Sequence, residues 1–133
     1  MADQDETLAR VQKMFESHQI RDGHGVDQPY VVSVLRDHVP AGWFGLVKEL
    51  TEDLIRLGWD RRVLQVKEKF GTLRFYISQR EDSLVNRTIA AKEQSATVCQ
   101  DCGGPGKWFE DGGWVATLCD PCRARQRATR AKA

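Results

Sequence analysis

The spacing of hydrophobic positions changes along the chain, and each spacing predicts a different element. Between residues 42 and 57, apolar side chains recur every three or four positions, which is the period of one helix face. Gly58 follows, where a helix C-terminus favours glycine. The pattern predicts an amphipathic helix over residues 42–57 with a core-facing stripe formed by Trp43, Leu46, Val47, Leu50, Leu54 and Leu57.

After that helix the period becomes two. Residues 63–68 and 73–77 alternate apolar and polar side chains, which predicts a β-hairpin within residues 62–78, joined through Phe70-Gly71-Thr72. Its apolar face is expected to pack on the 42–57 helix. Its other face is polar and basic, with Gln65, Lys67, Arg74 and Tyr76, and with Lys69 and Arg80 nearby. Such a face suits phosphates and a stacked base, although a merely solvated sheet face has the same pattern.

Three weaker patterns predict further helices. Residues 5–19 place Leu8, Val11, Met14 and Phe15 at helical spacing, and residues 82–96 have a shorter stripe. Residues 30–40 fit a helix or a strand, and we favour a helix because three aliphatic side chains share a helical face. The predicted class is therefore α+β, with helices packed on a small antiparallel hairpin or sheet.

Composition narrows the possible classes of partner and location. The 133 residues have a formal net charge of +1, from 20 basic and 19 acidic side chains, so the chain as a whole is no general polyanion binder. No apolar run approaches the roughly 18 residues of a membrane helix. The acidic start, "MADQDETLAR", does not resemble a secretory signal. We expect a cytoplasmic location, where thiols stay reduced.

Four cysteines near the end of the chain predict a metal site. Cys99 and Cys102 form one C-x2-C pair, and Cys119 and Cys122 form another after 16 residues. Two such pairs place four thiolates around one tetrahedral ion, which is the coordination of structural Zn²⁺. A redox couple needs one pair beside a βαβ pattern, a disulfide is disfavoured in a reducing compartment, and a catalytic zinc keeps an open position. We predict one structural zinc ion.

The segment between the two pairs predicts a zinc ribbon over residues 98–122. Residues 107–110 and 114–118 are expected to form a hairpin around the turn "DGG". Trp108, Phe109 and Trp114 are numerous for so small a core, so they are candidate anchors for a partner protein, although one or two of them could instead close the ribbon onto residues 1–97.

Residues 123–133 form a basic tail with four arginines, one lysine and no acid. Such a tail binds polyanions non-specifically or stays solvated and disordered, which is the commoner case. Arg123, Arg125 and Arg127 are therefore candidate partner-binding residues, with Lys67, Arg74 and Tyr76 of the hairpin.

No nucleophile–base arrangement is evident, and we expect a protein without catalytic activity. The three histidines, His18, His24 and His38, lie far from the cysteines in sequence. A minor alternative is a Mg²⁺-dependent nuclease, with Asp60 and Gln65-Val66-Lys67 completed by Glu49 or Glu52.

The strings "GWFGLVKEL", "LQVKEKFGTLRFYI", "CQDCGGPGKW" and "WVATLCDPC", spanning residues 42–122, resemble a group of small hypothetical proteins of bacteriophages and prophages. The resemblance implies a mobile-element setting in host cytoplasm. It implies a non-catalytic protein that binds and inhibits a host complex, such as a defence system. Nucleic-acid binding through the hairpin and tail is the alternative.

Overall fold

The computed structural model of the protein describes residues 2–25 and 27–131. In chain order, its helices and strands are α1 (Ala2–Ser17), β1 (Arg21–Asp22), the 3-10 helix η1 (Val32–Val34), α2 (Leu35–His38), the 3-10 helix η2 (Ala41–Trp43), α3 (Phe44–Arg56), β2 (Arg62–Val63), β3 (Gln65–Lys69), β4 (Thr72–Tyr76), α4 (Asp82–Ser95), β5 (Lys107–Asp111), β6 (Trp114–Leu118) and α5 (Asp120–Ala131). Helices and small antiparallel sheets confirm the predicted α+β class.

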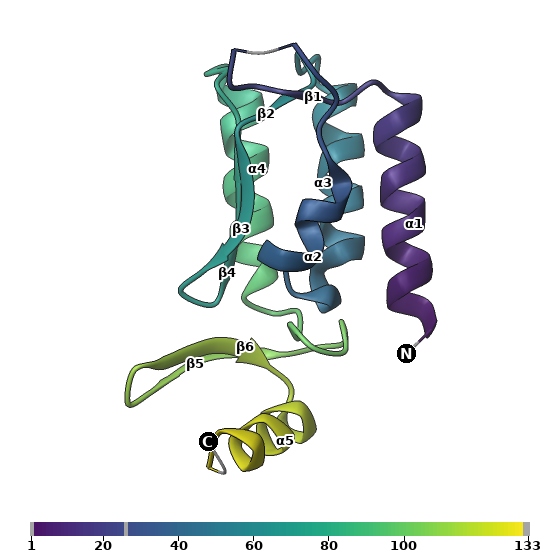
Figure 1. Ribbon diagram of the computed structural model, residues 1–133. Coiled ribbons are helices and arrows are strands. Elements are labelled where there is room, and N and C mark those ends of the chain that lie inside the picture. Colours follow the sequence, from purple (N-terminus) through teal and green to yellow (C-terminus); the bar gives the residue numbers. More distant parts are fainter. Residues whose placement is uncertain (1, 26, 132–133) are drawn as a thin grey trace.

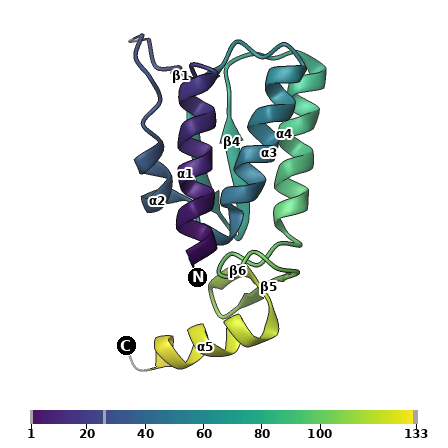
Figure 2. The ribbon, with the colours of Figure 1, turned by 90° about the vertical axis from the view of Figure 1, so that its right-hand side faces the viewer.

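The main body has two layers. Helices α1, α3 and α4 lie side by side, with α2 and the β3–β4 hairpin behind them (Figure 2). One continuous hydrophobic cluster, from Leu8 to Ala91, fills the space between the layers. Within the described residues, no helix combines the length and apolar character needed to cross a bilayer.

Helix α3 occupies the centre of this body, as its sequence pattern predicts. Val47, Leu50 and Leu54 are fully buried, while Leu57, after the last turn, is 42% exposed. The stripe therefore ends one turn earlier than expected. Gly58 adopts φ +90°, and its amide donates to Ile55 O, which closes the helix in the way that favours glycine.

The β3–β4 hairpin has the predicted strands and a neighbour that the sequence did not predict. Lys69 pairs with Thr72, so the turn contains only Phe70 and Gly71. Strand β4 packs on α4, where the Leu73 amide donates to Ser95 Oγ at 2.8 Å. The apolar face of the hairpin shares the core cluster with the stripe of α3, as expected, but the helix that lies nearest to β4 is α4, which was not predicted.

A short parallel pair was not predicted. Strand β1 pairs with β2, and the Gly23 amide donates to Val63 O at 2.8 Å. Each strand has two residues, too few to show an alternating pattern. This contact fixes the chain after α1 against the start of the hairpin (Figure 1).

The cysteine-containing unit and α5 lie at one end of the molecule, below the tips of α1, α3 and the β3–β4 hairpin (Figure 1). The unit has its own small hydrophobic cluster, which includes Cys99, Phe109, Leu118 and Cys122. The basic tail is not disordered over the described residues, because Asp120–Ala131 forms α5.

Candidate metal centre and basic hairpin face

The first cysteine pair lies in a tight turn between α4 and β5. Gly103 adopts φ +80°, and its amide donates to Cys99 O at 3.0 Å. The Cys102 and Gly104 amides point to sulfur, at 3.5 Å from Cys99 Sγ and 3.4 Å from Cys102 Sγ. This arrangement directs both thiols to one side of the turn and offers N–H donors to them.

The second pair joins strand β6 to helix α5. Cys119 ends the loop after β6, and Cys122 lies in the first turn of α5, behind Pro121. The Arg123 amide donates to Cys119 O at 2.9 Å. Both cysteines of this pair therefore lie at the start of α5. A metal ion bound by their sulfur atoms would fix the position of this helix.

The four sulfur atoms meet as the spacing predicts. All four Sγ atoms lie within 4.8 Å of one another, and Cys102 and Cys119 are 3.8 Å apart. A tetrahedral ion with metal–sulfur bonds of about 2.3 Å requires sulfur–sulfur separations of about 3.8 Å. The four free thiols therefore fit one metal ion of the kind that prefers sulfur, and zinc is consistent with them.

The pKa shifts of the cluster thiols differ in direction: the pKa of Cys99 is lowered, whereas those of Cys102 and Cys122 are raised. Burial opposes ionisation of Cys99, but the amides of Cys102, Cys119 and Asp101 outweigh it and lower the pKa of Cys99 from 9.0 to about 7. Burial, followed by the neighbouring Cys119 thiol, raises the pKa of Cys122. Arg125 Nη2 donates to Cys122 Sγ at 2.9 Å.

The metal centre is joined to the main body through the start of α3. Trp43 is fully buried, and its Nε1 donates to Val98 O at 2.8 Å. The Gly42 amide donates to Gln100 O, also at 2.8 Å. Gln4 of α1 donates to Asp101 O. The first cysteine turn therefore rests on backbone and side chains from two helices of the core.

A second junction joins the ribbon hairpin to the tip of the β3–β4 hairpin. Thr117 is fully buried, and its Oγ1 donates to Gly71 O at 2.7 Å. Trp108 Nε1 donates to Phe70 O at 2.9 Å. Both donors belong to the ribbon and both acceptors to one turn, so the two hairpins have a defined relative position.

The three ribbon aromatics do not form one exposed tip. Phe109 is 9% exposed and packs edge-on against the partly buried Trp114, with ring centroids 4.9 Å apart. Trp108 is 49% exposed but anchors the ribbon to Phe70. Phe109 therefore does not protrude as the sequence suggested, and α5 partly covers Trp114.

Arginine side chains of helix α5 pack over Phe109 and Trp114. Arg123 stacks over Phe109, 3.9 Å from the ring centroid, and Arg130 lies 4.6 Å from that of Trp114. Arg127 pairs with Asp111 at 3.1 Å, and Arg125 reaches Asp101 at 3.8 Å. The predicted partner-binding arginines thus make contacts within the molecule.

The basic side chains of the β3–β4 hairpin differ from those of α5 in their ion pairs. Lys67 and Arg74 are direct cross-strand partners, and Lys69 lies on the same face. Among the described residues, no ion pair includes these three side chains. Tyr76 on this face is 39% exposed. We call the set Lys67, Lys69, Arg74 and Tyr76 the basic hairpin face.

A shallow groove of about 190 Å³ continues this face between β4 and α4. Arg74 and Tyr76 line it from the strand, and Ile89 and Lys92 line it from the helix. None of its lining residues is acidic. Lys92 was not predicted as a site residue, because the sequence pattern of residues 82–96 does not show which side chains meet the hairpin.

The nuclease arrangement is not assembled as a metal cluster. Among the described residues, the four cysteines form the one group of three or more His, Cys, Asp or Glu side chains placed to share an ion. Glu52 pairs with Lys48 at 3.2 Å, and Asp60 Oδ1 accepts from the Arg62 amide at 3.1 Å. His24 Nδ1 lies 2.7 Å from Asp22 Oδ1, remote from the cysteines in the fold.

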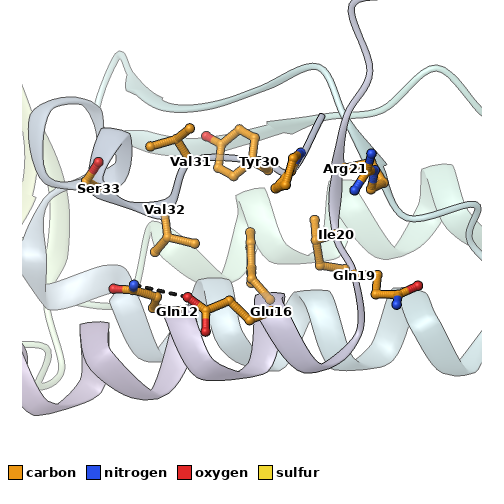
Figure 3. Close-up of a pocket in the computed structure, with 11 residues that line it drawn as sticks. Gln12, Glu16, Gln19, Ile20, Arg21, Tyr30, Val31, Val32 and Ser33 are labelled. Carbon is orange, nitrogen blue, oxygen red and sulfur yellow. Dashed lines mark hydrogen bonds between the residues drawn. The ribbon is translucent and has the colours of Figure 1, made fainter. Parts of the chain in front are cut away.

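A pocket of about 540 Å³ lies between α1 and residues 29–33 (Figure 3). Phe15, Ile20 and Val32 form its apolar floor. Its polar rim is mostly paired within the protein: Gln12 donates to Glu16, and Arg21 donates to Asp27. No predicted site residue lines this pocket.

Comparison with known proteins gives no evidence for a function, so the function is inferred from the geometry described above. No protein-family model, curated protein or solved structure matches the chain.

Proposed function

We propose that this protein is a non-catalytic, zinc-stabilised binding protein whose ligand is nucleic acid, bound on the basic hairpin face. The observation that best supports the proposal is the cross-strand pair Lys67 and Arg74, which has no acidic partner among the described residues. A phosphate backbone is the complementary ligand for such a row of cations. Tyr76 adds an aromatic surface on which a base can stack.

The contrast with α5 strengthens this choice of surface. Arg123 and Arg127 already face Asp111, and Arg125 faces the metal-binding sulfur and Asp101. These arginines serve the ribbon, whereas the hairpin cations are not used in ion pairs of the described structure. In this proposal the zinc ion has a structural role only, because four thiolates leave it no open position.

A protein partner is the second candidate, and the exposed indole of Trp108 favours it. Burial of Phe109 and partial burial of Trp114 leave one of the three expected anchors, so this candidate ranks behind nucleic acid. The phage setting and the inhibition of a host complex stay predictions from the sequence resemblance.

The proposal is tested by fluorescence anisotropy of a labelled oligonucleotide with zinc-loaded protein over a series of salt concentrations. The variant Lys67→Gln/Arg74→Gln removes both central cations and keeps their side-chain stems. Each lost phosphate contact should reduce the log–log salt slope by about 0.7 on a single strand, so the double variant should lose about 1.4. Affinity should fall at least about tenfold at moderate salt.

The matched control is Lys13→Gln/Arg36→Gln. Both residues are exposed, Lys13 on α1 and Arg36 on α2, outside the basic hairpin face, and neither forms an ion pair in the described structure. The control removes the same formal charge and should leave the salt slope unchanged. Equal losses for the two double variants would mean diffuse attraction, and the hairpin face would then be the wrong site.

A further inference from the structure

The turn of the β3–β4 hairpin holds an aromatic residue in an unfavourable backbone conformation. Phe70 has φ +53° and Gly71 has φ +78°, which are the left-handed values of a two-residue hairpin turn. Asn or Asp followed by Gly is favoured in such a turn, and a bulky side chain at the first position is strained. Folding of the hairpin therefore gives no reason for phenylalanine at position 70.

The ring of Phe70 also contributes little to the core. It is 64% exposed, the largest exposure among the large hydrophobic side chains of the described structure. The described ring–ring contacts join Phe15 with Tyr30, Trp59 with Phe75, and Phe109 with Trp114. The faces of Phe70 and Trp108 are thus free of ring–ring contacts in the part of the chain that the structure describes.

Phe70 and Trp108 come from different hairpins and are held together. The indole Nε1 of Trp108 donates to the carbonyl oxygen of Phe70 at 2.9 Å. A side chain at Gly71 would lie 2.9 Å from the same Nε1, so glycine permits this close approach. We call Phe70 and Trp108 the aromatic tip. The hydrogen bond holds the indole of Trp108 at the turn that carries Phe70.

The aromatic tip continues the basic hairpin face. Lys69 Nζ lies 5.5 Å from the centre of the Phe70 ring, and Lys69 is adjacent to the Lys67–Arg74 pair on the same face. Residues on one face of a strand are about 7 Å apart at every second position. The cations of the hairpin therefore lie between Tyr76 at one end and Phe70, with Trp108 bonded to it, at the other.

We propose that the aromatic tip is a base-stacking site and that the nucleic acid bound here is single-stranded. This inference rests on the proposed function and specifies its ligand. Bases of a duplex are already stacked on each other, whereas a single strand offers free faces to aromatic side chains. A basic surface that also carries exposed aromatic rings is the arrangement that binds single strands with little sequence preference.

The test compares two ligands of equal length and charge, an oligothymidylate and an abasic phosphodiester oligomer, using zinc-loaded full-length protein. Wild-type protein should bind the oligothymidylate at least about tenfold more tightly, since one stacked base changes affinity by about five- to a hundredfold. Phe70→Asn removes the ring and supplies a residue that the turn favours. It should bring the two affinities close together.

Two further measurements separate stacking from folding. Phe70→Asn should melt at or above the wild-type temperature, because the turn is relieved and little buried surface is lost. Phe70→Tyr keeps a ring and should retain the preference for bases. Trp108→Phe should also retain most of it, with a smaller ring.

The outcomes distinguish the two proposals. Equal binding of both ligands by wild-type protein, with Phe70→Asn unchanged, would overturn the stacking site and leave the polyanion face intact. Tighter binding of duplex than of single strand would also overturn it. Absence of binding to either ligand, combined with capture of a nuclease-resistant protein partner that Phe70→Asn abolishes, would overturn both and assign the aromatic tip to protein recognition.

Discussion

The amide nitrogen of Gly42 donates a 2.8 Å hydrogen bond to the carbonyl oxygen of Gln100, and the backbones of these two residues lie in direct contact. A Cβ atom at Gly42 would lie 2.7 Å from the carbonyl carbon of Gln100 and would also overlap Cys99 O. No rotamer change can relieve such overlap, since the obstacle is backbone. The 3-10 helix η2, directly before α3, and the first metal-binding turn are thus fitted to each other at this glycine.

Gly42→Ala should therefore destabilise the protein, by about 1–3 kcal/mol, as a small-to-large change in a tightly packed contact. The matched control is Gly45→Ala in the first turn of the adjacent helix α3, where an added Cβ meets nothing within 4 Å. Alanine there should be neutral or stabilising by up to about 1 kcal/mol, because it favours the helix. Chemical denaturation measures both, and equal stabilities of the two variants would contradict the close fit at Gly42.

Removal of the metal should unfold α5 before the core. The 12 residues of α5 begin at the second cysteine pair, and their contacts are with the ribbon, whereas the main hydrophobic cluster lies outside it. Because zinc binding and folding are coupled at such sites, a strong chelator should remove about 12 residues of helix from the far-ultraviolet circular dichroism.

Readdition of Zn²⁺ should restore that signal, and Mg²⁺ should not, because Mg²⁺ prefers oxygen ligands to thiolates. Cys122→Ser should reproduce the chelated spectrum, since it removes one thiolate from the first turn of α5. An unchanged spectrum after complete metal removal would show that the sulfur cluster does not hold the helix in place.

Regular patterns in the sequence predicted the regular parts of the fold. The helical stripe around Leu50 and the alternation around Val66 and Phe75 each report one buried face, and burial of that face determines the element. The cysteine spacing was equally informative, because ligand geometry restricts how the chain can approach the ion. Packing partners were less predictable: α4 lies nearest to β4, and the relative positions of helices leave no periodic signal in the sequence.

Helix α5 shows why the remaining elements were missed. Its exposed face and its packing face are both rich in arginine, so hydrophobic spacing does not indicate a helix. Arg123 packs on Phe109 through its guanidinium, and Arg130 does so on Trp114. A pattern that classes arginine as polar cannot register such contacts. Phe70 was likewise predicted only as part of a turn. An aromatic residue directly before the turn glycine is unusual, and this position could have indicated an exposed ring.

Asp111 explains why the arginines of α5 are not free for polyanions, and this role can be tested. Its carboxylate lies 3.1 Å from Arg127 and 3.7 Å from Arg123. Asp111→Asn should release the guanidinium of Arg127, while Arg123 stays stacked on Phe109, and so add a free cation on α5. Exposed ion pairs contribute about 0.2–1 kcal/mol, so oligonucleotide affinity should rise by about two- to fivefold, with a steeper salt dependence. Glu110→Gln changes the formal charge equally but removes no ion pair of the described structure. Anisotropy titrations of the two variants side by side separate pairing from net charge, and equal gains would mean that Asp111 does not restrain the helix arginines.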